Sequence, residues 1–123
     1  MGYHKSVVRR KDRRRNRSKK TSFAHPSRNR LVIHRSLKHF EAQVIDDFKG
    51  HTIFSASSKC KDLKPALKNI KNKTDLSKKV GEALASKAKE MKIKSVVLDR
   101  NGYPYHGRVK AFVESVRKNG LNL

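Results

Sequence analysis

Half of the net positive charge of this chain is concentrated in its first quarter. Residues 1–30 contain 12 Lys and Arg and one acid, whereas residues 31–123 contain 20 Lys and Arg and nine acids. The first segment has too little apolar surface to offset the repulsion between its charges, so it cannot fold alone. We therefore predict a basic arm over residues 1–29, disordered or at most a frayed helix, and one globular domain over residues 30–123.

The whole chain carries a net charge of +22, with 32 Lys and Arg against 10 Asp and Glu. A small domain with this charge repels itself, so a polyanionic partner is expected, and nucleic acid is the usual one. A membrane surface fits less well, because no long amphipathic segment combines a cationic face with bulky aromatic side chains. We expect neither a membrane nor a small-molecule substrate as a partner.

Cysteine usage and hydropathy indicate the cellular compartment in which the chain works. Cys60 is the only cysteine, so there is no internal disulfide and no CxxC pair for a metal. No apolar run is long enough for a signal peptide or a membrane span, and the Arg-rich start lacks the apolar face of an organellar transit peptide. We predict a cytoplasmic chain, with a plastid source left open, that needs no cofactor and no metal.

Three short segments predict β-strands. Residues 31–35 form a β-branched run, and residues 40–44 and 52–57 alternate apolar and polar side chains, the period of a half-buried strand. Residues 36–39 and 47–50 are typical of tight turns. Three strands joined by tight turns predict an antiparallel meander.

Two main helices and a fourth strand are predicted in the second half. A helix from Thr74 or Asp75 to about Lys92 is indicated by apolar residues at helical spacing: Leu76, Val80, Leu84, Ala88 and Met91. Residues 93–98 predict a buried strand, parallel to a central strand because a helix precedes it. A last helix over about residues 107–118 is indicated by a stripe that comprises Val109, Phe112, Val113 and Val116.

Residues 58–73 leave room for one short helix. Leu63, Leu67 and Ile70 recur at helical spacing, and Pro65 would fall in its first turn, where proline is tolerated. We predict an α/β fold with a single mixed sheet. In it, a three-stranded antiparallel meander is joined by one parallel strand and accompanied by two main helices.

The most informative segment lies before the last helix, at residues 99–108, Asp-Arg-Asn-Gly-Tyr-Pro-Tyr-His-Gly-Arg. Tyrosines can stack on unpaired bases or sugars, and glycines let the backbone approach a phosphate closely. The segment ends at a helix N-terminus, whose free amides attract anions. An RNA contact is favoured over the alternative, a rigid connector whose tyrosines pack on the domain. Residues 35–39, Arg-Ser-Leu-Lys-His, offer a second cationic turn.

Several motifs together resemble one known family. They are residues 35–39 as above, 42–47 (Ala-Gln-Val-Ile-Asp-Asp), 50–52 (Gly-His-Thr), 79–81 (Lys-Val-Gly), 96–100 (Val-Val-Leu-Asp-Arg) and 102–109 (Gly-Tyr-Pro-Tyr-His-Gly-Arg-Val). Over about residues 30–123 they are similar, in order and spacing, to the bacterial large-subunit ribosomal protein L-eighteen family. The resemblance implies an α/β fold of the translational-machinery type and 5S ribosomal RNA as ligand. It also implies contacts with 23S ribosomal RNA and with neighbouring proteins of the central protuberance of the large subunit.

We predict RNA contacts on three segments. In the arm they are Arg9, Arg10, Lys11, Arg13, Arg14, Arg15, Arg17, Lys19 and Lys20. At the first strand and the turn after it they are Arg30, Arg35, Ser36, Lys38 and His39. In the loop and at the start of the last helix they are Arg100, Asn101, Tyr103, Tyr105, His106, Gly107, Arg108 and Lys110.

Two other functions fit parts of the sequence. The predicted topology resembles that of ribonuclease H, and a two-metal nuclease would need converging carboxylates, for which the candidates are Asp46, Asp47, Glu82 and Asp99. Adjacent side chains on a strand diverge, and Asp99 is expected to pair with a cation or cap a turn, so we predict no catalysis. An architectural DNA-binding protein would explain the charge but not the aromatic loop, because duplex DNA offers no splayed bases to stack on.

Overall fold

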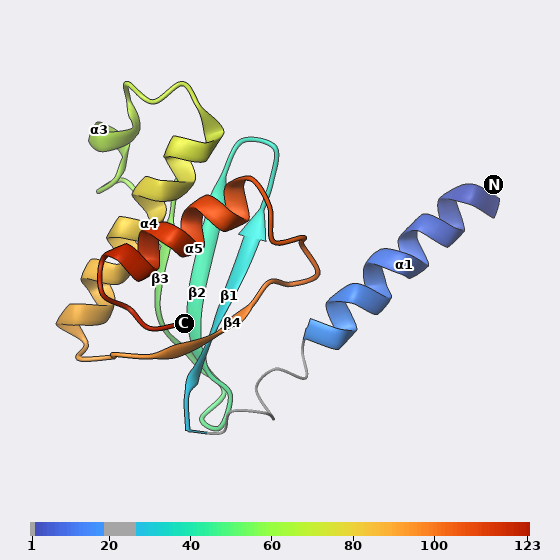
Figure 1. Ribbon diagram of the computed structural model, residues 1–123, viewed down its shortest axis with the longest axis horizontal. Helices are drawn as coiled ribbons and strands as arrows, with labels where there is room; N and C mark the ends of the chain where they lie inside the picture. Colours follow the sequence, from blue (N-terminus) through green and yellow to red (C-terminus); the bar gives the residue numbers. More distant parts are fainter. Residues whose placement is uncertain (1, 19–26) are drawn as a thin grey trace.

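The computed structural model describes residues 2–18 and 27–123, and Figure 1 shows its elements in chain order. They are α1 (Gly2–Ser18), β1 (Asn29–Arg35), β2 (Phe40–Asp46), β3 (His51–Ser57), α3 (Lys64–Leu67), α4 (Lys73–Glu90), β4 (Val96–Asp99) and α5 (Arg108–Lys118). No helix in these two ranges has both the length and the apolar character needed to cross a membrane.

The four strands form one mixed sheet in the order β3-β2-β1-β4. Strands β1, β2 and β3 are antiparallel neighbours, and β4 lies parallel to β1 with Leu31 beside Leu98. The meander and the parallel fourth strand are therefore confirmed. The turn between the first two strands and the loop after β4 come to the same end of the sheet, because β1 and β4 run in the same direction.

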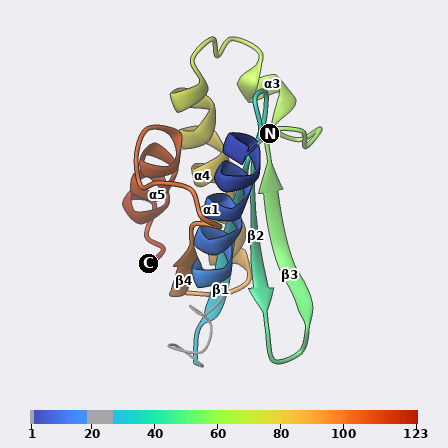
Figure 2. The ribbon, with the colours of Figure 1, turned by 90° about the vertical axis from the view of Figure 1, so that its right-hand side faces the viewer.

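Helices α4 and α5 cover one face of the sheet (Figure 2). The core between these helices and the sheet is mainly apolar, and Phe40 from β2 and Phe112 from α5 pack together in it with their rings 4.9 Å apart. The predicted stripe of α5 is confirmed, since all four of its residues are buried. On the opposite face, Val97 lies beside Arg30 and is 8% exposed, so it is buried outside the main core.

Helix α4 begins and ends differently from the prediction. Asn72, and not Thr74 or Asp75, caps it, with its side-chain oxygen accepting a hydrogen bond from the Thr74 amide. Met91 was expected in the apolar stripe but is 52% exposed. The reason is that the helix ends at Glu90 and the chain turns at Lys92, where φ is +58°. This turn also explains why β4 begins at Val96 and not at Ile93.

The two helices approach each other closely at Gly81. A Cβ atom there would lie 2.9 Å from the Phe112 carbonyl oxygen, so no larger residue fits without movement. The Ser115 hydroxyl donates to the Lys78 carbonyl across the same contact. Helix α5 is thus held to α4 as well as to the sheet, and its N-terminus has a definite position relative to the strands.

The segment between β3 and α4 contains the predicted short helix. It is α3, with Pro65 in its first turn, as expected from the tolerance of that position for proline. Its four residues bury no side chain.

Residues Gly2–Ser18 of the predicted arm form helix α1, where the sequence led us to expect disorder or a frayed helix. Figure 1 shows α1 extending away from the body, with its C-terminal end beside the loop after β4. Of the side chains described in α1, at residues 5–17, none is buried. The helix therefore gains no stability from a core.

Candidate nucleic-acid interface

The loop after β4 is shaped by two residues with positive φ, Asn101 at +53° and Gly102 at +82°. Asp99 holds this turn by accepting a hydrogen bond from the Asn101 amide at 2.9 Å. The turn-capping role expected for Asp99 is confirmed. The Tyr103 amide closes the turn by donating to the Arg100 carbonyl at 3.0 Å, and the chain bends again at Tyr105 and His106 before Gly107.

Tyr103 joins this loop to the end of β1. Its hydroxyl lies 3.3 Å from both the amide nitrogen and the carbonyl oxygen of Arg35, accepting from the first and donating to the second. The Arg35 guanidinium lies over the Tyr103 ring, 4.9 Å from its centre. Tyr103 is therefore a connector as well as part of the surface, and Tyr105, at 39% exposed, is the tyrosine of this loop that is more open to solvent.

Arg108 holds the turn between β1 and β2. Its terminal nitrogens donate to the carbonyls of Ser36 at 2.7 Å and His39 at 3.1 Å, and its guanidinium lies over the Phe40 ring. Its buried Nε atom has no hydrogen-bond partner. Burial lowers the pKa of Arg108, and the nearby charge of Arg35 lowers it further. The turn after β1 and the loop after β4, two of the three segments predicted to bind RNA, thus form one continuous surface.

The turn itself is closed by its own polar groups. The Ser36 hydroxyl accepts a hydrogen bond from the His39 amide at 3.0 Å, and the His39 ring contacts the Ser58 hydroxyl. Leu37, at 83% exposed, and Lys38 form the tip of the turn. Of the predicted turn residues, Lys38 is the one whose charged group faces solvent without a structural task in the described contacts.

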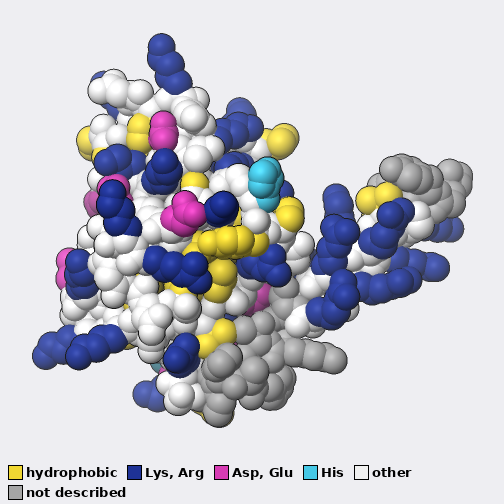
Figure 3. Space-filling view, in the orientation of Figure 1, with side chains coloured by type: hydrophobic (Ala, Val, Ile, Leu, Met, Phe, Trp, Pro, Cys, Tyr) yellow, Lys and Arg dark blue, Asp and Glu magenta, His cyan; other side chains and the backbone are white. Residues whose placement is uncertain are grey.

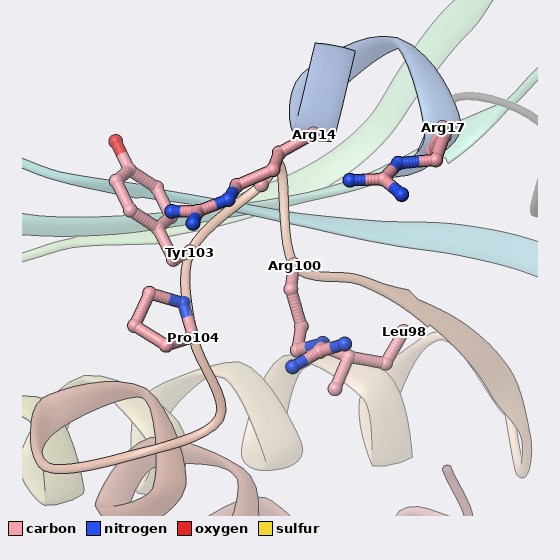
Figure 4. A pocket seen from close by; sticks show the side chains of 7 residues that line it. Arg14, Arg17, Leu98, Arg100, Tyr103 and Pro104 are labelled. Atoms are coloured by element: carbon pink, nitrogen blue, oxygen red, sulfur yellow. The ribbon is translucent and has the colours of Figure 1, made fainter. Parts of the chain in front are cut away.

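The arm meets the loop at the C-terminal end of α1. Arg15 donates to the Asn101 side chain at 3.3 Å, and a Cβ atom on Gly102 would lie 3.1 Å from the Arg15 amide nitrogen. Residues of α1, of β4 and of the loop after it line one hollow, shown in Figure 4: Arg14, Arg17, Leu98, Arg100, Gly102, Tyr103 and Pro104. Three arginines therefore surround an aromatic ring and a proline, a combination suited to phosphates and bases.

Arg30 has an internal role that the sequence did not reveal. Its guanidinium binds Asp47 through two hydrogen bonds, at 3.0 and 3.1 Å, and binds buried Asp99 at 2.7 Å. Burial acts to lower the pKa of Arg30, but the bonds and charges of the two carboxylates outweigh it and raise the pKa. Its charge is neutralised within the protein, so an RNA contact through this group would compete with two ion pairs.

The other predicted residues are displayed at the surface. Lys and Arg side chains cover α1 (Figure 3), and those at positions 9, 10, 11 and 13 are all exposed. In the loop, Arg100, Tyr105, His106 and Gly107 are exposed, as is Lys110 in α5. Lys19 and Lys20 lie outside the described residues. The structure adds one cation that the sequence analysis did not single out. It is Lys73, which lines a second hollow beside Arg35 and Arg108.

The carboxylates weighed for a nuclease site have other tasks. Asp47 and Asp99 both pair with Arg30, and the Asp46 side chain accepts from the backbone amides of the turn after β2. Within residues 2–18 and 27–123, no group of three or more His, Cys, Asp or Glu could hold a metal ion. The arrangement offers ion pairs and turn caps in place of a catalytic centre.

A small mixed α/β body, a cationic surface built around a tyrosine, and a basic helix beside it define the class of basic nucleic-acid-binding proteins. Comparison with known proteins narrows the class. Residues 5–123 match the family described as "Ribosomal L18 of archaea, bacteria, mitoch. and chloroplast", and the chain belongs to this family. The predicted family is therefore confirmed, and the chain is a structural, non-enzymatic component of the large ribosomal subunit.

Curated relatives agree with the family match. The chain is 50% identical over 117 residues to "Large ribosomal subunit protein uL18" of Staphylococcus haemolyticus, covering 95% of this chain and 93% of the relative. It is 52% identical over 113 residues to the protein of the same name from Thermus thermophilus, covering 92% and 91%. These relatives are bacterial, so the predicted location on the cytoplasmic ribosome is confirmed as well.

Proposed function

We propose that this chain binds 5S ribosomal RNA and helps to attach it to 23S ribosomal RNA in the central protuberance, beside neighbouring large-subunit proteins. The motif at residues 99–108 supports this choice of ligand, through the resemblance that it carries. Membership of a large-subunit ribosomal family supports an RNA partner in general.

The observation that carries the proposal is that all three predicted segments meet around Tyr103. The turn is joined to the loop through the Tyr103 hydroxyl and through Arg108, and the arm is joined to it through Arg15 and Asn101. Such convergence of segments that lie far apart in the sequence is expected of a binding surface. Stability of the fold alone would not favour gathering the cations of three segments at one place, because like charges repel.

The two parts of the chain have different tasks in this proposal. The arm, residues 1–29, supplies charge for phosphates and threads along RNA, a use that suits a basic segment without a core. The globular part, residues 30–123, supplies shaped contacts: Lys38 and Arg100 for phosphates, and Tyr105 for stacking on an unpaired base.

A competition experiment tests the proposal. Labelled 5S RNA is bound to the full chain and displaced with unlabelled 5S RNA, a scrambled RNA of equal length, or duplex DNA at the same salt concentration. We expect 5S RNA to displace at concentrations at least about tenfold lower than the other two, since shaped contacts add to the common electrostatic term.

Equal displacement by all three competitors would refute 5S selectivity, and better displacement by duplex DNA would favour the architectural alternative. Sequencing the RNA that co-purifies with the chain gives an independent check. The co-purified RNA should contain a larger share of 5S RNA than total ribosomal RNA does. A fragment of 23S RNA should be recovered with the chain only when 5S RNA is present too.

A further inference from the structure

A second hollow is lined by Tyr103 but by no residue of the arm. It is lined by Arg35, Ser36, Leu37, Lys73, Tyr103 and Arg108. These residues come from β1, the turn after it, the first residue of α4, the loop after β4 and the first residue of α5. We call it the Arg35–Lys73 hollow. In the described contacts, the charged groups of these two residues donate no hydrogen bond to a carbonyl or a carboxylate.

Two helices begin with a cation at this place. Lys73 is the first residue of α4, and Arg108 is the first residue of α5, which has no acidic residue in its first turn and no side chain capping its N-terminus. A helix N-terminus carries a partial positive charge, so a cation there is disfavoured and an anion is favoured. The N-terminus of α4 has the Asn72 cap and Asp75 in its first turn, whereas that of α5 has neither, so a bound anion would chiefly stabilise α5.

The three cations of the hollow form no ion pair with the acids among the described residues. Five ion pairs are formed by the described residues, and none of them includes Arg35, Lys73 or Arg108. Asp75, the acid in the first turn of α4, is directed to Lys78. The charge of Arg35 is close enough to lower the pKa of Arg108, as expected of cations held together without a counter-charge.

We propose that the Arg35–Lys73 hollow binds one backbone phosphate of the RNA, and that Lys73 is a direct ligand of it. The proposal rests on the proposed function and adds to it one residue, Lys73, that lies outside the segments predicted to touch RNA. Arg35 is held over the Tyr103 ring with its fork of donors unoccupied in the described contacts, which suits a phosphate oxygen pair. Arg108, whose terminal nitrogens already bind carbonyls, adds its charge to the hollow.

The test compares Lys73→Gln with Lys89→Gln, a matched control. Both lysines are exposed, both lie on α4, and the control stands at the opposite end of the helix. The dependence of RNA affinity on salt counts the phosphates that a protein neutralises, at roughly 0.7 to 0.9 in the logarithmic slope for each. We expect Lys73→Gln to reduce the slope by about that amount and the affinity several-fold, and Lys89→Gln to change neither.

Ethylation interference locates the phosphate directly. Ethylating one backbone phosphate should weaken binding of the unaltered chain and of Lys89→Gln, and should weaken binding of Lys73→Gln less, because only Arg35 and Arg108 remain at that phosphate. Thermal melting separates the effect from folding: Lys73→Gln should melt at the same temperature or slightly higher, because it removes a cation from a helix N-terminus.

Equal slopes and equal interference patterns for the two variants would overturn the proposal. Failure of the unaltered chain to prefer 5S RNA is a separate outcome that would overturn the proposed function. In that case the slopes of the two variants are measured on any folded RNA, and a difference between them still supports the hollow.

Discussion

Helices α1 and α5 differ in how much side-chain packing stabilises them. Helix α1 is the longer, with 17 residues against 11, yet none of its described side chains is buried, whereas α5 buries six residues. In proteins, tertiary packing of an apolar face stabilises a helix more than its length or its residue propensities do. Helix α5 is therefore held by the core, whereas the described side chains of α1 provide no such packing.

The ends of the two helices show the same difference. Helix α5 ends in a Schellman motif, in which Gly120, at a φ of +100°, donates to Arg117 and Leu121 donates to Val116. Helix α1 meets the body through Arg15, beside a loop that belongs to the proposed interface. Helix α5 completes the fold, and α1 would extend the proposed interface beyond it.

The largest effect is expected from Phe112→Ala. Phe112 is fully buried against Phe40, so the variant should lower the free energy of unfolding by about 3–5 kcal/mol. Urea denaturation measures this. Val8→Ala is the control from α1, where Val8 is 43% exposed, and it should cost less than about 0.5 kcal/mol. Equal costs would show that the arm contributes to the core after all.

Deleting residues 1–20 should give the reverse result. The free energy of unfolding should stay within about 0.5 kcal/mol of the full chain, because no described side chain in the deleted helix is buried. RNA affinity should fall by roughly a hundredfold near physiological salt, with a shallower salt dependence. Circular dichroism and binding isotherms check both parts, and loss of the folded spectrum would refute the division between arm and body.

Arg108→Lys tests whether an interface residue acts through the fold. The charge is kept but the two-pronged contact with the Ser36 and His39 carbonyls is lost, so stability should fall by about 2 kcal/mol. RNA affinity should fall about tenfold while the salt slope stays the same, because no phosphate contact is removed. Arg117→Lys, an exposed site on the same helix, is the control. A changed slope would instead make Arg108 a direct phosphate ligand.

The two tyrosines of the loop should separate in the same way on a smaller scale. Tyr105→Ala should weaken RNA binding by about tenfold, the value of one stacking contact, without changing the melting temperature. Tyr103→Phe should lower stability by about 1 kcal/mol, because the hydroxyl that binds the Arg35 backbone is lost. If Tyr105→Ala melts early and binds normally once folded, the loop is a connector.

The smallest effect is expected from Lys92→Gly, and it is a gain. Lys92 has a φ of +58° at the end of α4, a conformation that favours glycine. Stability should rise by up to about 1 kcal/mol, and RNA affinity should stay the same. A loss of stability would show that the Lys92 side chain contributes more than its backbone conformation costs.

Local pattern alone was enough to predict much of this protein. Period-two alternation predicted the meander, the apolar stripe predicted α5, and the charge gradient predicted where the arm ends and the body begins, a division that the deletion tests. The cationic turn and the aromatic loop were also found from residue types within single short segments. Each of these features depends on neighbours within a few positions, which is the range over which secondary structure and turn chemistry are set.

Only the tertiary structure decided what the charged residues do. Arg30 pairs with Asp99 across 69 positions, and Arg108 binds the Ser36 carbonyl across 72, so two predicted RNA contacts have structural tasks as well. Lys73 enters the proposed interface because α4 begins beside the turn. No local pattern can show this, because the order of strands in the sheet and the packing of helices on it decide which distant side chains meet.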